Sequence, residues 1–179
     1  MQCNIILKNR LEGGIVMDHE NNIVHDSYFL ISLFKQEHRE VTQLQIQKLM
    51  YFFEAYYMNV KSTNKLYDCN FNAWMFGPVA IPLYKEYKNF GEFPINLTEE
   101  KVNIGEQIDK CKKNLLQELY NVFGKLSANQ LVNLTHQEGS PWYKKWEENN
   151  RRVVYGPASY IDKEQTKIWF KENFIVDET

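Results

Sequence analysis

Apolar side chains recur at helical spacing along most of the chain. Ile46, Leu49, Met50, Phe53 and Tyr57 lie three, four or seven positions apart, which puts them on one face of a helix. The same reasoning predicts further helices over residues 26–35, 82–91, 106–123, 127–134, 141–146 and 162–174. Residues 70–74 are typical of a short strand, residues 77–81 of a turn, and residues 92–105 of a loop that can contain strand pieces.

Helix starts are marked by a repeated capping pattern, in which a short polar residue is followed three positions later by Gln. Thr42 with Gln45, Ser127 with Gln130, and Asp162 with Gln165 all follow it. Asp26 or Ser27 is the expected cap of the first helix. No repeat or low-complexity linker marks a domain boundary. We therefore expect a mainly α fold: a single compact multi-helix domain with a few short strands or turns between helices.

Residues 12–17, EGGIVM, suggest an unusual origin for the first part of the chain. Their back-translation can contain a bacterial ribosome-binding sequence placed shortly before the Met17 codon. This predicts that translation starts at Met17, that residues 1–16 are a translated leader or extension, and that residues 17–179 form the folded domain. A genuine short N-terminal arm is the alternative.

Charge and cysteine content limit the classes of partner. The formal net charge is −2, which argues against a general attraction to nucleic acid or to an anionic membrane. No apolar run approaches the roughly 20 residues needed to span a bilayer. Cys3, Cys69 and Cys111 are far apart and odd in number, so we expect no disulfide framework and a cytoplasmic location. Aromatic residues make up 15% of the chain, which indicates either aromatic packing or an adhesive exposed face.

Catalytic motifs are missing from the sequence. It contains no phosphate-binding glycine loop, no nucleophile elbow and no zinc-protease helix. His136 and Glu138 form H-x-E, the start of a zinc-deaminase signature, but no cysteine follows Cys111 to complete that metal site. At a helix end, His136 more often bonds a backbone carbonyl or carries a favourable charge, and it can also face a partner. We expect no catalytic set, no metal and no cofactor.

The stretch AWMFGPV combines two aromatic residues with Gly-Pro. On physical grounds alone, Trp74 and Phe76 are expected in the core. Gly77 is expected to supply a backbone angle that other residues resist, and Pro78 to stiffen the turn. The turn as a whole is then a candidate for shaping a surface that meets a partner.

Three segments in fixed order carry a family resemblance: LQIQKLMYFFEAYYM (44–58), AWMFGPVAIPLYKEYKNFG (73–91) and LVNLTHQEGSPW (131–142). Together they resemble the Panacea domain family, also called SocA-like antitoxins or phage-associated proteins. The residues that match, and that the resemblance implies as motif or partner-binding positions, are Lys48, Tyr51, Trp74, Gly77, Pro78, Pro82, Tyr84, His136, Glu138, Pro141 and Trp142.

This resemblance implies an antitoxin of a bacterial or prophage toxin–antitoxin pair. Such a protein neutralises a toxin encoded by a neighbouring gene through direct protein–protein contact, and is not an enzyme. Nucleic acid and membranes are not expected as partners. Two alternatives stay open: an adaptor that delivers the toxin to a protease, and a small enzyme that uses His136 and Glu138 as an acid/base pair.

Overall fold

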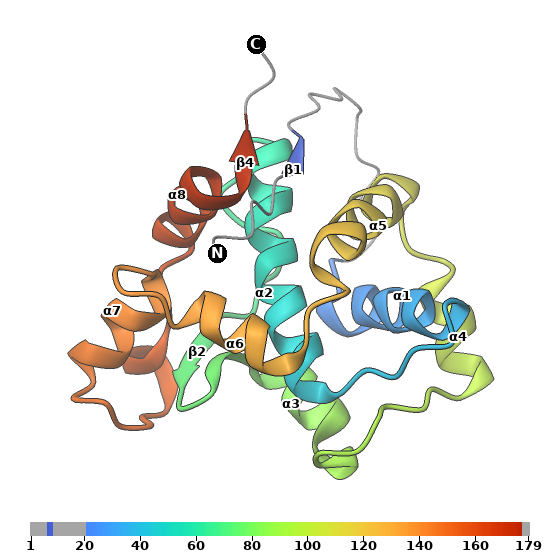
Figure 1. Cartoon of the computed structure of the whole chain (residues 1–179), viewed down its shortest axis with the longest axis horizontal. Helices are drawn as coiled ribbons and strands as arrows, with labels where there is room; N and C mark the ends of the chain where they lie inside the picture. Colours follow the sequence, from blue (N-terminus) through green and yellow to red (C-terminus); the bar gives the residue numbers. More distant parts are fainter. Residues whose placement is uncertain (1–6, 9–20, 177–179) are drawn as a thin grey trace.

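Helix α2 (Gln43–Val60) runs through the middle of the protein and is covered by other elements on several sides (Figure 1). The computed structural model describes residues 7–8 and 21–176. Of the 18 residues in α2, 14 are buried, so apolar side chains are needed on every face of this helix. Its predicted start is confirmed, because the Gln45 side chain accepts the Thr42 N–H at 3.1 Å.

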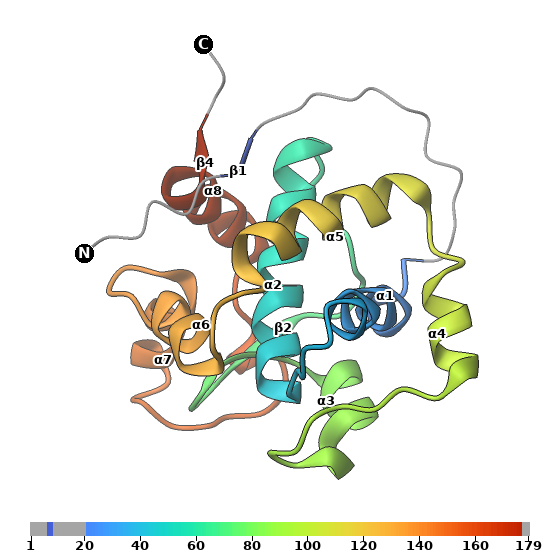
Figure 2. The same ribbon diagram turned by 45° about the vertical axis from the view of Figure 1, so that its right-hand side comes forward.

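The remaining helices pack around α2 in two groups. Helices α1 and α4 lie to one side, α6, α7 and α8 lie to the other, and α5 packs against both α1 and α2 (Figures 1 and 2). The mainly α prediction is confirmed, and no helix in the described residues is both long and apolar enough to cross a membrane. The bounds are α1 (Ile23–Gln36), α3 (Ile81–Tyr87), α4 (Glu99–Gly105), α5 (Lys110–Phe123), α6 (Ala128–Thr135), α7 (Pro141–Glu148) and α8 (Lys163–Phe174), with short 3-10 helices η1 (Lys88–Phe90) and η2 (Gly156–Ser159).

Two pairs of short strands complete the described part of the chain. Strands β2 (Phe71–Trp74) and β3 (Gly77–Ala80) form an antiparallel hairpin, whereas β1 (Leu7–Lys8) and β4 (Ile175–Val176) pair in parallel. The predicted strand at residues 70–74 is confirmed, but the turn predicted at residues 77–81 is wrong. The turn is Met75–Phe76, and the Gly-Pro that suggested it begins the second strand. Apart from β1, the predicted leader at residues 1–16 lies outside the described residues.

Several helix ends differ from their predicted positions. Helix α1 begins three residues before Asp26, because the Asn22 side chain accepts the Val24 N–H at 3.0 Å and acts as the cap. Helix α5 begins at Lys110, later than predicted, after Asp109 caps it. Helix α4 was predicted as loop; Thr98 caps this single short amphipathic segment, which is too brief to show a clear period. The cap predicted at Ser127 is confirmed.

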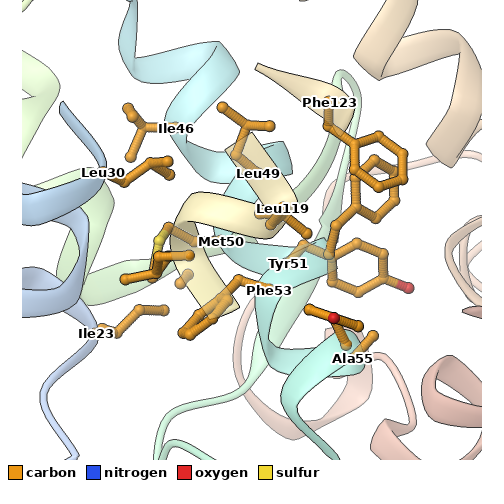
Figure 3. Packing of buried hydrophobic residues seen from close by; sticks show 14 of the residues in the cluster. Ile23, Leu30, Ile46, Leu49, Met50, Tyr51, Phe53, Ala55, Leu119 and Phe123 are labelled. Carbon is orange, nitrogen blue, oxygen red and sulfur yellow. The ribbon is translucent and has the colours of Figure 1, made fainter. Parts of the chain in front are cut away.

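The core is built largely from α2 side chains and is rich in aromatic rings (Figure 3). Phe52 is the centre of one cluster, with its ring centre 5.1 Å from that of Phe123, 5.8 Å from Phe170 and 5.7 Å from Phe174. Aromatic pairs at these separations add stability beyond the area they bury. Many of the aromatic residues in the sequence therefore pack in the core.

One buried and one partly buried ion pair link elements that are distant in the chain. Lys112 of α5 bonds Asp26 of α1 at 3.0 Å, and the Tyr67 hydroxyl donates to the same carboxylate at 2.8 Å. Burial raises the pKa of Asp26, and Lys112 and Tyr67 oppose that rise. Lys163 of α8 bonds Glu54 of α2 at 2.6 Å. These contacts tie α5 to α1 and α8 to α2.

Candidate functional site

The three motif segments meet at the β2–β3 hairpin, which lies beside α6 and α7 at one end of α2 (Figures 1 and 2). From α2, the Lys48 amino group donates to the Pro78 carbonyl at 2.8 Å. From α7, the Trp142 indole N–H donates to the Trp74 carbonyl at 3.0 Å. The hairpin backbone is thus held by side chains from both of the other two segments.

Lys48 lies completely inside the protein, with 0% of its surface exposed. Its place is therefore beneath the hairpin and not on a surface that a partner can reach. Burial lowers the pKa of Lys48 to about 7, because a charged amine is poorly solvated there. A lysine buried in this way is uncommon and costs stability, so its contact with the hairpin needs a specific explanation.

Gly77 adopts a φ of +100°, which confirms the prediction that this position needs a backbone angle other residues resist. A Cβ atom here would lie 2.7 Å from Lys48 Cε and 2.8 Å from Thr135 Oγ1. The hairpin backbone therefore approaches α2 and α6 more closely than any side chain permits. The predicted role of glycine at this position has both a conformational and a steric cause.

His136 follows α6 and stacks on Trp142, with ring centres 3.7 Å apart. Its Nε2 atom is buried and has no hydrogen-bond partner in the described part of the chain. Burial, and then the charge of Lys48, lower the pKa of His136 to about 4. The ring is uncharged at neutral pH, which rules out one of the expected alternatives for this position, a favourable charge at the helix end.

Glu138 lies on the turn between α6 and α7 and is exposed. No hydrogen bond or ion pair joins it to His136 among the described residues. In the same part of the chain, no group of three or more His, Cys, Asp or Glu side chains could hold a metal ion. His136 and Glu138 are two positions apart in the sequence, but their side chains do not come together in one site.

The outer side of the hairpin carries exposed apolar side chains. Met75 is 57% exposed and Phe76 is 62% exposed, so the prediction that Phe76 belongs to the core is wrong. Trp74 is half-buried, and its ring centre lies 5.1 Å from that of Tyr84 and 6.0 Å from that of Tyr155. We call Trp74, Met75, Phe76, Tyr84 and Tyr155 the hairpin face.

A groove of about 660 Å³ opens beside the hairpin face. Its walls come from the start of α2, the hairpin, α3, α6 and the segment after α7, and Glu92 is its one charged lining residue. The residues that line it are Thr42, Gln43, Leu44, Gln47, Trp74, Met75, Phe76, Val79, Tyr84, Gly91, Glu92, Ala128, Asn129, Val132 and Val153.

Three other motif residues, Tyr51, Pro82 and Pro141, have local structural roles. The Tyr51 hydroxyl is buried and shares a hydrogen bond of 3.1 Å with Thr166. Pro82 lies in the first turn of α3, and Pro141 is the first residue of α7, where a missing N–H costs nothing. None of these three lines the groove.

Sequence reasoning missed Met75 and Phe76 as surface residues. The signal was present, because exactly two residues separate the strand that ends at Trp74 from Gly77, and two-residue connections are typical of hairpins. Gly77-Pro78 instead favoured a turn two residues later than the observed one.

Comparisons with known proteins identify relatives of this sequence. The sequence profile described as "Antitoxin SocA-like, Panacea domain" matches residues 46–143, which contain α2 from Ile46 onward, the hairpin and the start of α7. The chain is 28% identical over 110 residues to a curated protein of Caulobacter vibrioides (strain NA1000 / CB15N) named "Antitoxin SocA". This match covers 57% of the chain and 58% of that relative, so the chain spans little more than half of the relative's length. No solved structure matches it significantly.

The family profile covers more than half of the chain and contains all the contacts that hold the hairpin between α2 and α7. The chain therefore belongs to the SocA-like antitoxin family with a Panacea domain.

Proposed function

We propose that this protein is a cytoplasmic antitoxin that neutralises a toxin protein, encoded by a neighbouring gene, by direct contact through the hairpin face. Family membership and the relative named as an antitoxin support the general role. In this role the protein is a binding module and not an enzyme. In its favour, His136 and Glu138 form no bonded pair, and Lys48 is out of reach of any substrate.

The observation that carries the choice of surface is the clustering of exposed apolar groups at the hairpin. Met75, Phe76, Tyr84 and Tyr155 are four of the nine large hydrophobic side chains exposed in the described residues. Val153, a fifth, lines the groove together with Met75, Phe76 and Tyr84. Contiguous apolar surface of this kind commonly marks a protein interaction site. Aromatic and methionine side chains are also favoured as anchors in such interfaces.

The groove gives this surface a shape that an apolar projection can fill. It combines a substantial volume with a lining in which Glu92 is the one charged residue, so a segment with several charges would lose solvation there without gaining a partner for each charge. We therefore expect the toxin to insert uncharged, mainly apolar side chains beside Phe76. A buried anchor of this type typically contributes roughly 2–4 kcal/mol of affinity.

Co-expression with the product of the neighbouring gene tests the proposal. That product alone is expected to stop growth, and the wild-type protein is expected to restore growth and to co-purify with it. A neighbouring product that is harmless alone, or that stays toxic beside the wild-type protein, would refute the proposed function.

A surface variant tests the hairpin face itself. Met75→Ser with Phe76→Ser is expected to abolish rescue and binding while the melting temperature stays close to that of the wild type. Phe93→Ser is the matched control, because Phe93 is 77% exposed and does not line the groove. If the double variant rescues as well as the control, the toxin binds elsewhere.

The toxin's half-life separates masking from delivery to a protease. Masking predicts that the half-life is unchanged or longer when the antitoxin is present. A shorter half-life that depends on one cellular protease would instead assign the adaptor role.

A further inference from the structure

We propose that Lys48 is a positioning residue for the hairpin face: from inside the protein it holds the Pro78 carbonyl and so sets the place of Met75 and Phe76, which meet the partner. This inference rests on the proposed function for its binding consequence. It adds a residue that affects affinity without touching the partner.

The outer edge of β3 is completed by side chains of α2 in place of a third strand. Strand β3 pairs with β2 along its other edge. The Gln47 side-chain amide accepts from the Ala80 N–H at 2.8 Å and donates to the Ala80 carbonyl at 3.2 Å. Lys48 satisfies the Pro78 carbonyl, and proline has no N–H that needs a partner. Neighbouring residues of one helix thus satisfy this edge at two successive outward-facing positions.

Lys48 supports the part of the hairpin nearest the turn. Gln47 bonds Ala80 at the far end of β3, whereas Lys48 bonds Pro78, two residues after Phe76. The aliphatic chain of Lys48 also lies against the Gly77 backbone, where no Cβ would fit. Because the turn has only two residues, a shift of Gly77–Pro78 is passed directly to Met75 and Phe76.

No other role accounts for the chemistry of Lys48. The Pro78 carbonyl is its one hydrogen-bond partner found in the described residues, and no carboxylate there lies within ion-pair distance of it. The one titratable group found to interact with Lys48 in the described residues is His136, which follows α6. Burial disfavours the charged form of this imidazole, so it does not supply a counter-charge. An apolar residue would fill this space at lower cost, so the position is explained by the contact with the backbone.

The test compares Lys48→Met with a control that loses an equivalent bond elsewhere. Ser32→Ala removes a buried side-chain donor to a backbone carbonyl, that of Phe29 at 2.7 Å, on a helix that does not line the groove. Lys48→Met is expected to weaken binding of the neighbouring gene's product about tenfold or more, and Ser32→Ala to change it less than about twofold. Equal affinities for the two folded variants would overturn the inference.

A double-mutant cycle separates positioning from a general loss of stability. If Lys48 acts through the turn, Lys48→Met is expected to weaken binding by a smaller factor when Phe76→Ser is present than in the wild type. Independent effects that multiply would mean that Lys48 does not act through Phe76. Lys48→Gln, whose side chain is too short to reach Pro78, provides the same cycle if Lys48→Met does not fold.

Amide hydrogen exchange tests the positioning without any partner. Residues 71–80 are expected to exchange faster in Lys48→Met than in the wild type, and at the wild-type rate in Ser32→Ala. Unchanged exchange in Lys48→Met would overturn the positioning role. If the wild type fails to bind the neighbouring product, the proposed function fails, whereas faster exchange in Lys48→Met would still support the positioning role.

Discussion

The imidazole of His136 lies flat against the indole of Trp142, with ring centres 3.7 Å apart and planes within 2° of parallel. The same indole donates its N–H to the hairpin backbone at Trp74. One aromatic stack therefore links the end of α6 to the β2–β3 hairpin, and the histidine is part of this support.

The first prediction concerns the protonation of His136. Burial lowers its pKa to about 4, below the ordinary value of 6.5, so the unfolded chain binds this proton more tightly between these two values. The stability that this group contributes is present above pH 6.5 and is lost as pH falls towards 4. NMR titration of the imidazole protons is expected to show no transition for His136 between pH 5.5 and 8. A midpoint near 6.5 would contradict the buried, neutral assignment.

The second prediction concerns Lys48 and pH. Its pKa is about 7 in the folded protein and has an ordinary value of 10.5, so the unfolded chain binds the proton more tightly between these values. This contribution to stability is complete above pH 10.5 and is lost as pH falls towards 7. Urea unfolding is expected to show that the wild type gains about 2 kcal/mol between pH 7 and pH 9 relative to Lys48→Met. Parallel pH profiles would show that Lys48 is not perturbed.

The third prediction concerns Gly77. Gly77→Ala places a Cβ against Lys48 and Thr135 in a backbone conformation that already disfavours it. We expect a loss of roughly 1–3 kcal/mol from backbone strain and a similar further loss from overpacking. Gly139→Ala is the control, because Gly139 has a φ of +82° but no neighbouring atom within 4 Å of its Cβ position. Equal losses in chemical denaturation would remove the steric part of the explanation.

The fourth prediction concerns the buried pair of Asp26 and Lys112. Lys112→Met leaves the Asp26 carboxylate buried without its cation and is expected to cost roughly 3–5 kcal/mol of unfolding free energy. Asp26→Asn combined with Lys112→Met removes both charges and is expected to recover much of that loss. If the double variant is as unstable as the single one, packing and not charge explains the effect.

The helical framework was predictable because its signals are local. The cap at Thr42 and the apolar spacing of α2 lie within a few residues of each other, and packing does not change their meaning. The bounds of the weaker helices were less certain, since Asn22 and Asp109 compete with nearby residues as caps.

The hairpin was not predictable in the same way, because its partners are distant in sequence. Pro78 is tolerated within β3 because its nitrogen, which has no hydrogen to donate, faces away from β2. Its outward-facing carbonyl meets Lys48, 30 positions earlier in the chain. Phe76 is a large apolar residue of the kind usually found in the core, but its position in the two-residue turn places its side chain on the surface. The burial of Lys48 had one local signal, namely that Lys48 and Glu54 are the only charged residues of its 18-residue helix.

The side chains along the hairpin's edges determine how another protein can associate with it. Gln47 and Lys48 occupy the outer edge of β3, and the Ile161 N–H bonds the Phe71 carbonyl on the outer edge of β2. A visiting strand would have to displace these bonds before it could extend the sheet. Recognition by β-strand addition is therefore disfavoured, and a protein partner is expected to contact the hairpin through side chains.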